Sequence, residues 1–480
     1  MKVDKLAMLT DFYELTMGNG YMLSGKMDQI VCFDMFFRKV PDDGGFAIMA
    51  GLDQIIRYLR DLKFEKEDID FLRQKADFDE QFYNYLENFK FSCDVWAMPE
   101  GTPIFPNEPI FVVTGPVIQA QLIETVVLLT LNHQCLIATK ANRIVRAALG
   151  RSVMEFGSRR AHGYDGAVLG ARAAFIGGCI GTSCTVVEQT FGIPAMGTMA
   201  HSWVQMFDSE YEAFKTYAEV YPDSCTLLVD TYNVLKSGVP NAIKVFNEVV
   251  IPRGFRPKGI RIDSGDITYL SKESRKMLDE AGFQDCKIVA SNSLDEYIIR
   301  DIIIQGAMVD TFGVGERLIT SKSEPVFGGV YKLSAIKKDD VWIPKMKLSE
   351  NISKTTIPGF KQVWRLFDRT TGKAISDLIT HKDEVVDDSG SYTIFDPEQT
   401  WKQKTIENFT AKPLLIPIFN KGVLVYESPS LHEIQAFCKA QISTLWEEVL
   451  RFENPHSYYV DLSQKLWDCR DHLRKSMSGA

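Results

Sequence analysis

Short apolar runs alternate with polar or glycine-containing segments between residues 153 and 312. The runs cover residues 153–156, 175–180, 195–199, 226–229, 259–262, 287–290 and 308–312. Several connecting segments, of which 268–281 and 294–305 are the clearest, have the apolar spacing of helices. Strands that alternate with helices predict a parallel sheet. We expect an α/β fold in which about seven such strands form an irregular barrel.

The flanking segments lack this rhythm. Helical spacing occurs at residues 1–25, 50–60, 67–89 and 117–149, whereas 31–40 and the proline-interrupted 98–114 predict strands and turns. Beyond Thr320, strands are expected at 330–347, 363–367 and 391–395, and helices at 431–450 and 459–476. We therefore expect a barrel domain at 131–325 and a second α/β domain made from 1–130 and 326–430, with C-terminal helices at 431–480.

Composition and charge restrict the class of protein. A chain of 480 residues predicts two or three domains. The net charge of −9 argues against broad binding of nucleic acid or anionic membranes. The N-terminal residues lack the features of a signal peptide, and no apolar run is long and uncharged enough to span a bilayer. Because the nine cysteines are scattered without paired spacing, we expect reduced thiols and a cytoplasmic location.

Candidate reacting groups follow the apolar runs. The carboxyl ends of parallel strands meet at one edge, where α/β enzymes hold their chemistry. Arg159 and Arg160 follow the first run; they suit a solvated surface pair, or a carboxylate or phosphate that the guanidinium fork matches. His201 follows the third run, and it is compatible with a core histidine, an acid or base, a phosphoryl acceptor or a phosphate ligand.

Later runs end in an acidic segment and a glycine pair. The segment 263–266, Asp-Ser-Gly-Asp, suits Mg²⁺ through water or ribose hydroxyls, and Asp263 is the better candidate. Alternatively, Ser264 or Asp266 caps the next helix. Gly313 and Gly315 let backbone N–H groups approach an anion, although such a pair is often only a turn.

Two further features have structural explanations. Cys179 and Cys184 lack the second pair or neighbouring histidine of a metal site, so we expect buried thiols. Tyr13 suits stacking on an aromatic ligand, but the residues alone favour packing in the core.

Taken together, several motifs resemble the nicotinate phosphoribosyltransferase family. They occur in the family's order from the N-terminus to about Thr320, whereas the region beyond Phe367 matches less distinctly. The matching segments are DFYELTM, FFRKVPDDGGFAIMAGL, EFGSRRAHG, FIGGCIGTSC, GTMAHSW, LLVDTY, IRIDSGD, ASNSLDE and DTFGVGERLIT.

The resemblance implies a type II phosphoribosyltransferase that works as a homodimer. The implied reaction joins nicotinate to 5-phosphoribosyl 1-pyrophosphate and releases nicotinate mononucleotide and pyrophosphate, the entry step of NAD salvage. It also implies Mg²⁺ carried by the substrate pyrophosphate, and ATP hydrolysis coupled through a phosphohistidine at His201. Tyr13 would stack on the pyridine ring from the partner subunit.

The resemblance also assigns roles to the other candidates. Positive charge from Arg159, Arg160, Arg261 and Mg²⁺ suits the departing pyrophosphate. Asp263 would hold the ribose. The nicotinate site would be formed by Tyr13, Arg159, Arg160 and Ser183, and the 5′-phosphate site by Ser291, Asn292, Gly313 and Gly315.

Ser183 bears on the choice between acid and amide. The related nicotinamide enzymes carry aspartate in this context, and an aspartate would repel nicotinate where a serine donates to it. We therefore expect nicotinate as substrate. The alternatives are a quinolinate or nicotinamide phosphoribosyltransferase, or a non-catalytic binding protein on a degenerate barrel.

Overall fold

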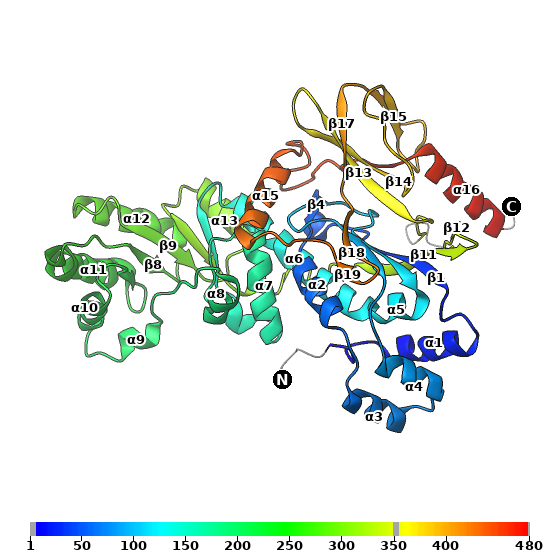
Figure 1. The fold of residues 1–480 in the computed structure, drawn as a ribbon. Coiled ribbons are helices and arrows are strands. Elements are labelled where there is room, and N and C mark those ends of the chain that lie inside the picture. Colours follow the sequence, from blue (N-terminus) through cyan, green and yellow to red (C-terminus); the bar gives the residue numbers. More distant parts are fainter. Residues whose placement is uncertain (1–5, 349–354, 479–480) are drawn as a thin grey trace. The chain divides into compact units, whose positions relative to one another are not determined.

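The computed structural model describes residues 6–348 and 355–478, and its packing divides the chain into two compact units (Figure 1). Both ends of the chain form the first unit, Met1–Leu136 with Val326–Ala480. The second unit is the continuous segment Ile137–Pro325.

A parallel sheet forms the centre of the second unit. Its strand order is β6-β10-β9-β8-β7, and each neighbouring pair is parallel. The strands are β6 (Ser152–Glu155), β10 (Thr311–Val314), β9 (Lys287–Ser291), β8 (Gly259–Ile262) and β7 (Thr226–Leu228). The predicted parallel sheet is therefore confirmed, with five of the expected runs as strands.

The other two expected strands are not strands. Phe175 and Ile176 end helix α7 (Tyr164–Ile176), because an apolar run does not by itself distinguish a buried helix from a buried strand. The segment 195–199 forms a bridge only at Ala195, which pairs in parallel with Thr182, and Thr182 pairs in turn with Glu155. In the described residues no ladder joins β7 to Ala195, so a closed barrel is not confirmed.

Helices pack against this sheet and bury its apolar side chains. Leu227, Ile260 and Ile288 from the strands form one core with Phe246 and Phe283. The helices of the unit include α8 (Thr185–Phe191), α9 (His201–Gln205), α10 (Glu210–Val220), α11 (Val239–Val245), α12 (Ile267–Glu280), α13 (Glu296–Ile304) and α14 (Glu316–Ile319). The expected helices at 268–281 and 294–305 are confirmed as α12 and α13.

An antiparallel sheet of seven strands forms the core of the first unit. Its order, β12-β11-β1-β5-β3-β18-β19, places strands from both ends of the chain side by side (Figure 1). The strands are β1 (Ile30–Phe36), β3 (Asp94–Ala97), β5 (Phe111–Pro116), β11 (Val330–Lys338), β12 (Val341–Pro344), β18 (Ile416–Asn420) and β19 (Val423–Leu424), beside the small β2 (Ala47–Ile48) and β4 (Pro103–Ile104).

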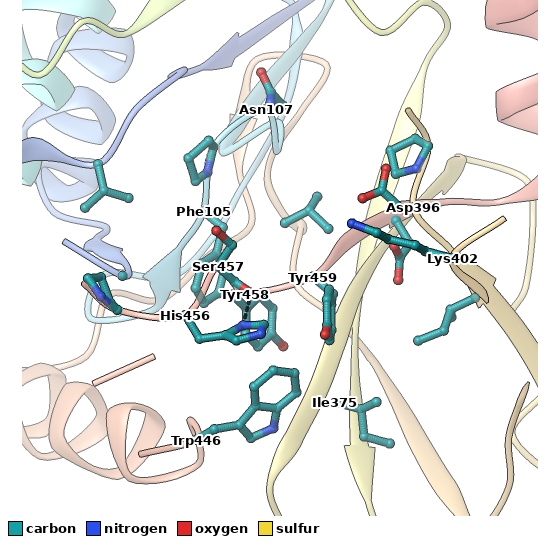
Figure 2. A pocket seen from close by; sticks show the side chains of 18 of the residues that line it. Phe105, Asn107, Ile375, Asp396, Lys402, Trp446, His456, Ser457, Tyr458 and Tyr459 are labelled. Atoms are coloured by element: carbon teal, nitrogen blue, oxygen red, sulfur yellow. Dashed lines mark hydrogen bonds between the residues drawn. The ribbon is translucent and has the colours of Figure 1, made fainter. Parts of the chain in front are cut away.

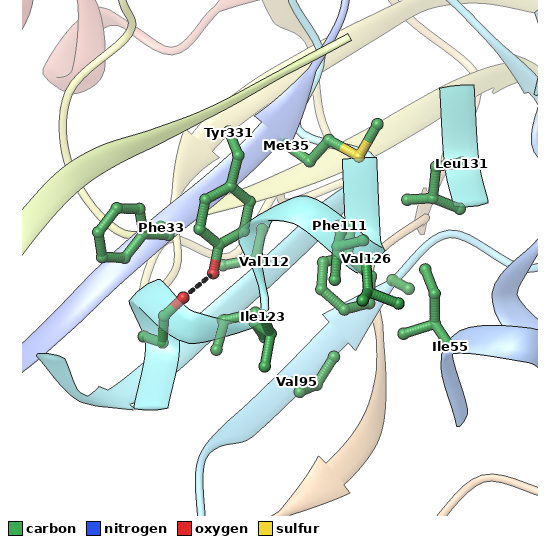
Figure 3. Close-up of a cluster of buried hydrophobic side chains, with 14 of the residues drawn as sticks. Phe33, Met35, Ile55, Val95, Phe111, Val112, Ile123, Val126, Leu131 and Tyr331 are labelled. Carbon is green, nitrogen blue, oxygen red and sulfur yellow. Dashed lines mark hydrogen bonds between the residues drawn. The ribbon is translucent and has the colours of Figure 1, made fainter. Parts of the chain in front are cut away.

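Side chains from β1, β5 and β11 interlock in this core (Figure 3). Phe33 and Tyr331 stack with ring centroids 4.9 Å apart, and the Tyr331 hydroxyl donates to the Ala120 carbonyl at 2.7 Å. Ala120 belongs to α5 (Val117–Leu122), so this bond fixes α5 against the sheet. Other helices of the unit are α1 (Phe12–Leu23), α2 (Leu52–Asp61), α3 (Lys66–Lys75), α4 (Glu80–Glu87) and the start of α6 (Glu124–Ala147).

Two details of these helices differ from expectation. The single helix expected at 67–89 is two helices, because Asp79 caps α4 by accepting from the Gln81 N–H at 2.9 Å. The helical stretch Val117–Ala147 has the length and composition of a membrane span, yet 67% of its most apolar window is buried inside the fold. A buried core helix passes the same test, and this one packs as such.

A second sheet, β17-β13-β14-β20, encloses a fully buried ion pair. Arg365 donates to both carboxylate oxygens of Asp377, at 2.8 and 2.6 Å, and to the Pro103 carbonyl at 2.8 Å. The surrounding elements are β13 (Lys361–Asp368), β14 (Ala374–His381), β15 (Tyr392–Phe395), β16 (Gln403–Ile406), β17 (Phe409–Pro413), β20 (Val460–Leu462), α15 (Leu431–Ser443) and α16 (Gln464–Ser478). Burial, and then the charge of Asp377, raises the pKa of Glu108 well above its usual range. The neutral form of Glu108 is therefore favoured beside the Arg365–Asp377 pair.

We predict that Arg365→Met lowers the free energy of unfolding by about 3–5 kcal/mol, because Asp377 is left as a buried charge without its partner. The matched control is Arg369→Met, which removes a half-exposed pair with Asp388 and should cost less than about 1 kcal/mol. Urea unfolding followed by circular dichroism measures both. Equal destabilisation by the two substitutions would contradict the assignment.

Candidate active site

The carboxyl ends of the parallel strands bring most of the predicted site residues to one edge of the sheet. Glu155, Ile262, Ser291 and Val314 are the last residues of β6, β8, β9 and β10. Since the four strands run in the same direction, the segments that follow them emerge together.

Asp263 lies at the centre of this edge. Its Oδ1 accepts a hydrogen bond from the Ser291 hydroxyl and lies 3.6 Å from Nη2 of Arg261. Its Oδ2 lies 3.7 Å from Nε2 of His201. The structure therefore brings together His201, Arg261, Asp263 and Ser291, which come from three separate parts of the sequence.

Arg261 connects the strands to the segment that leads into His201. Its Nη1 donates to Thr198 Oγ1 at 3.1 Å and to the Met199 carbonyl at 3.3 Å, and its Nε donates to Ser291 Oγ at 3.2 Å. His201 then begins α9, and its Nδ1 lies 3.2 Å from the Thr231 hydroxyl. One guanidinium thus holds the Thr198–Met199 backbone beside the ends of β8 and β9.

Asp230 is a site residue that the sequence reasoning did not select. Its Oδ2 accepts from the Asp263 N–H at 3.1 Å and from the Ser264 hydroxyl at 2.6 Å. Its Oδ1 is buried and has no hydrogen-bond donor in the described part of the chain. The signal was present, because Asp230 follows the run 226–229 as Asp263 follows the run 259–262.

Asp266 is the helix cap that the alternative interpretation expected. Its side chain accepts from the Tyr269 N–H at 3.0 Å and so terminates the loop before α12. Of the two aspartates in the segment, only Asp263 contacts His201 and Arg261.

Arg159 and Arg160 lie exposed in a short turn directly after β6. Arg160 interacts electrostatically with the carboxylate of Glu316, so the surface-pair interpretation and the anion-binding interpretation both remain open for this turn. Beneath the turn, Glu155 accepts from the Gly157 N–H and from the Thr182 hydroxyl, the latter at 2.7 Å.

Burial raises the pKa of Glu155, a second residue that the sequence reasoning missed. The Glu155 carbonyl also accepts from the Ser183 N–H at 2.9 Å. This strand end therefore places Ser183 and the arginine turn close to one another.

Gly313 in β10 and Gly315, which follows the strand, are needed for packing as well as for the approach of an anion to the backbone. A Cβ at Gly313 would lie 2.5 Å from the Phe156 ring, so only glycine fits beside β6. A Cβ at Gly315 would lie 3.2 Å from the Phe156 carbonyl. After β9, Asn292 and Ser293 adopt positive φ angles of 89° and 46°, which turn the backbone sharply at the same edge.

Tyr13 belongs to the other unit and is not a core residue, since 46% of it is exposed. Burial of its hydroxyl region, and then the charge of Glu124, raises the pKa of Tyr13 to about 12. The neighbouring Glu14 is fully buried and accepts hydrogen bonds from Thr10 and from Thr125, the latter at 2.8 Å. Burial raises the pKa of Glu14 to about 7.

In the part of the chain that the structure describes, side chains alone do not form a metal site. No group of three or more histidine, cysteine, aspartate or glutamate residues there could hold an ion. Cys179 is buried and Cys184 half-buried, both as free thiols.

Family models match three consecutive parts of the chain. Residues 8–132 match the nicotinate phosphoribosyltransferase N-terminal domain, residues 151–384 the nicotinate phosphoribosyltransferase family, and residues 360–470 the C-terminal domain of the same enzymes. The C-terminal match extends over the region where the sequence motifs were least distinct.

Individual relatives agree with these matches. A nicotinate phosphoribosyltransferase of Bacillus subtilis is 44% identical over 467 residues, covering 97% of this chain and 94% of the relative. The human nicotinate phosphoribosyltransferase is 31% identical over 519 residues, covering 96% and 95%.

Solved structures show the same architecture. The crystal structure of human nicotinic acid phosphoribosyltransferase superposes with a TM-score of 0.85 at 29% identity, covering 97% of this chain and 100% of that chain. A Pyrococcus furiosus nicotinate-nucleotide pyrophosphorylase superposes with a TM-score of 0.71 at 24% identity, covering 92% and 96%, and shares the fold.

We predict that Glu14 makes the protein less stable as pH rises. The pKa of Glu14 is about 7 in the folded state against an ordinary 4.5, so the folded state binds more protons between these values and its stability falls across that window. Glu14→Gln cannot lose a proton. Its stability relative to wild type should therefore increase by about 1 kcal/mol between pH 5 and pH 8.

Urea unfolding at each pH measures this difference. The matched control is Glu80→Gln, an exposed carboxylate whose pKa is lowered through a hydrogen bond from Arg73. It should show no comparable gain at pH 8. A stability difference between Glu14→Gln and wild type that is constant with pH would contradict the prediction.

Proposed function

We propose a catalytic arrangement for this chain, which belongs to the nicotinate phosphoribosyltransferase family. The chain is a phosphoribosyltransferase of NAD biosynthesis that joins nicotinate to 5-phosphoribosyl 1-pyrophosphate and releases nicotinate mononucleotide and pyrophosphate. The observation that best supports the arrangement is the convergence of His201, Arg261 and Asp263 at the edge of the parallel sheet.

The reaction needs electrostatic help more than covalent machinery. As the bond between the ribose C1 and pyrophosphate breaks, positive charge develops on the ribose and negative charge on the leaving group. The pyridine nitrogen of nicotinate is already a nucleophile and forms the new bond to C1. Asp263 holds the ribose hydroxyls, and Arg261 stabilises the departing pyrophosphate from the same edge.

Nicotinate binds at the end of β6 in this proposal. Arg159 and Arg160 are exposed, so they are available for the carboxylate of nicotinate and for pyrophosphate. The Ser183 hydroxyl donates to the same carboxylate. Tyr13 stacks on the pyridine ring, contributed by the partner subunit of a homodimer.

The 5′-phosphate binds at the ends of β9 and β10. Ser291, Asn292, Gly313 and Gly315 supply hydroxyl, amide and backbone donors there. The left-handed turn at Asn292 and Ser293 and the glycine that lies against Phe156 support this assignment, because both allow a backbone to approach an anion closely.

Mg²⁺ enters with the pyrophosphate. The unpartnered buried Oδ1 of Asp230 and the carboxylate of Asp263 are oxygen ligands of the kind that Mg²⁺ accepts, directly or through water. A bound Mg²⁺ would neutralise charge on the leaving group. Asp230 also holds the Asp263–Ser264 backbone in place whether or not the ion is present.

His201 couples the reaction to ATP through a phosphohistidine. An imidazole nitrogen attacks the γ-phosphorus of ATP, the bond to ADP breaks, and water later hydrolyses the P–N bond to release phosphate. The side chain of His201 is 39% exposed, which supports access by the nucleotide. Phosphorylation adds negative charge beside Asp263 and Arg261, at the site where pyrophosphate binds.

The finer architecture is part of the same proposal. The Glu155–Thr182–Ala195 bridges continue the parallel sheet, and Arg261 reaches from β8 to Thr198 and Met199. We infer that these hydrogen bonds close an irregular barrel over residues 131–325, with the other α/β domain and the C-terminal helices at 1–130, 326–430 and 431–480. A cytoplasmic location fits free cysteines throughout the described residues.

We predict that His201→Asn abolishes ATP coupling. Asparagine keeps one polar atom near Thr231 but cannot form a phosphoramidate, so ATP should no longer accelerate nicotinate mononucleotide formation, and ATP hydrolysis should fall to background. A slow ATP-independent transfer should remain. Product formation and ADP release, each measured with and without ATP, test this.

The matched control is His472→Asn on the exposed face of α16, which should behave as wild type. Full ATP-dependent turnover by His201→Asn would refute the assignment of the phosphohistidine.

We predict that Ser183→Asp lowers kcat/KM for nicotinate by at least about tenfold, because the new carboxylate repels that of the substrate. The value for nicotinamide should be unchanged or raised. Ser183→Ala is the matched control, since it removes the hydroxyl without adding charge and should affect nicotinate less. Steady-state assays with nicotinate, nicotinamide and quinolinate measure the preference. Comparable efficiency of wild type with nicotinamide would contradict the role of Ser183.

A further inference from the structure

A large cavity lies within the first unit, and the proposed reaction does not use it (Figure 2). Its volume is about 1060 Å³, at the upper end of the roughly 300–1000 Å³ of small-molecule sites. Its lining comes from the segments near Arg38 and Phe105, the β15–β16 hairpin, and the stretch from Trp446 to Asp461. None of the residues assigned to the reaction lines it.

One part of the wall is aromatic. Trp446 and Tyr459 meet edge to face with centroids 5.4 Å apart, and His456 and Tyr459 do the same at 5.7 Å. Tyr459 remains 46% exposed even though Trp446 and His456 pack against its ring. An aromatic ring that stays half-exposed beside a cavity is a stacking surface for a planar ligand.

A buried network holds this wall in position. Tyr458, the neighbour of Tyr459, stacks on Phe105 with centroids 3.9 Å apart and an angle of 11° between the rings. The Tyr458 hydroxyl donates to Asp377 Oδ1 at 3.0 Å, and Asp377 is the partner of Arg365. The wall is therefore fixed before any ligand arrives, which lowers the entropic cost of binding.

The remaining wall is charged. In the view of Figure 2, Asp396 and Lys402 lie on one side of the cavity and Trp446 and His456 on the other, with Tyr459 between them. Lys402 and Lys404 both line the cavity and are exposed, and Lys404 also interacts electrostatically with Asp368.

Acidic groups reduce this positive charge only in part. The Nε of Arg38 is buried without an acceptor in the described residues, which adds an unsatisfied donor. Asp461 is 4% exposed, and burial followed by the charge of Asp396 raises the pKa of Asp461 to about 7. A partly protonated Asp461 leaves the lysines in excess.

We propose that this cavity is a nucleotide-binding site separate from the reacting centre. The base stacks on Tyr459 beside Trp446, the phosphate lies against Lys402 and Lys404, and Asp396 accepts from the ribose hydroxyls. A flat aromatic surface next to two exposed lysines suits a phosphorylated nucleoside better than either an uncharged aromatic or a bare phosphate. This inference does not depend on the proposed roles of His201 and Asp263.

Binding of AMP and adenosine to the full chain tests the proposal. AMP carries both recognised groups, whereas adenosine lacks the phosphate. We expect AMP to bind to wild type in isothermal titration calorimetry. Tyr459→Ala should weaken both probes by about tenfold, as loss of one base stack does. Lys402→Glu should weaken AMP by about tenfold or more and leave adenosine unchanged.

The control variants are Trp401→Ala and Lys412→Glu, an exposed aromatic and an exposed lysine that do not line the cavity. Both should bind AMP as wild type does. Thermal unfolding of each variant checks the fold, and Tyr459→Phe, which keeps the ring, should retain binding if Tyr459→Ala proves unstable.

Three results would overturn the proposal. These are no AMP binding by wild type at millimolar concentration, AMP binding that Tyr459→Ala and Lys402→Glu leave intact, and AMP binding that is lost only in His201→Asn. The last outcome would place the nucleotide at the reacting centre. A failure of the proposed reaction chemistry would leave AMP binding and its dependence on Tyr459 unchanged.

Discussion

The geometry of the candidate active site, at the carboxyl ends of the parallel strands, depends on one guanidinium group, that of Arg261. Arg261 is the third residue of β8, yet it contacts the end of β9 and the backbone that precedes His201. In the described residues no strand ladder joins the segment before His201 to β8, because the segment after Ala195 is not a strand. Without Arg261, the segment that leads to His201 loses the two hydrogen bonds that Thr198 Oγ1 and the Met199 carbonyl accept from β8. In the proposed mechanism the charge of Arg261 also stabilises pyrophosphate, so one side chain would have both a chemical role and the role of a structural cross-link.

Two buried carboxyl groups hold the backbone beside the candidate site residues. Asp230 fixes the turn that presents Asp263, and Glu155 fixes the turn that presents Arg159 and Arg160. Each accepts a backbone N–H and a side-chain hydroxyl, which orients the following residues without contact between the carboxylate and solvent. Such supports cost desolvation free energy, which these hydrogen bonds offset for Glu155 and for Oδ2 of Asp230, whereas Oδ1 of Asp230 has no donor in the described residues.

The sequence predicted the individual strands and helices better than it predicted whether the parallel sheet closes into a barrel. The runs at 226–229, 259–262 and 287–290 have strand lengths and polar ends, and they are strands. The prediction of a strand at 175–180 was wrong because Phe175 and Ile176 lie in the last turns of helix α7, where the helix is buried on every side. His201 and Asp263 were predicted from their positions after apolar runs, and the structure brings the two side chains together. Asp230 also follows an apolar run, but one sequence does not show which carboxylates support a neighbouring residue, so Asp230 and Glu155 were not selected. Tyr13 was expected in the core from composition alone, and its exposure agrees better with the resemblance.

The interleaved strand order of the first unit has a consequence for synthesis on the ribosome. β1 pairs with β5 soon after both emerge, but its other edge must wait for β11, and Cys32 and Ser334 are 302 residues apart along the chain. At about 5–20 residues per second, that edge stays open for roughly 15–60 s. During this interval the continuous segment Ile137–Pro325 is completed first. A nascent chain therefore keeps one edge of β1 unpaired until β11 has been synthesised, and an unpaired strand edge can hydrogen-bond to another chain.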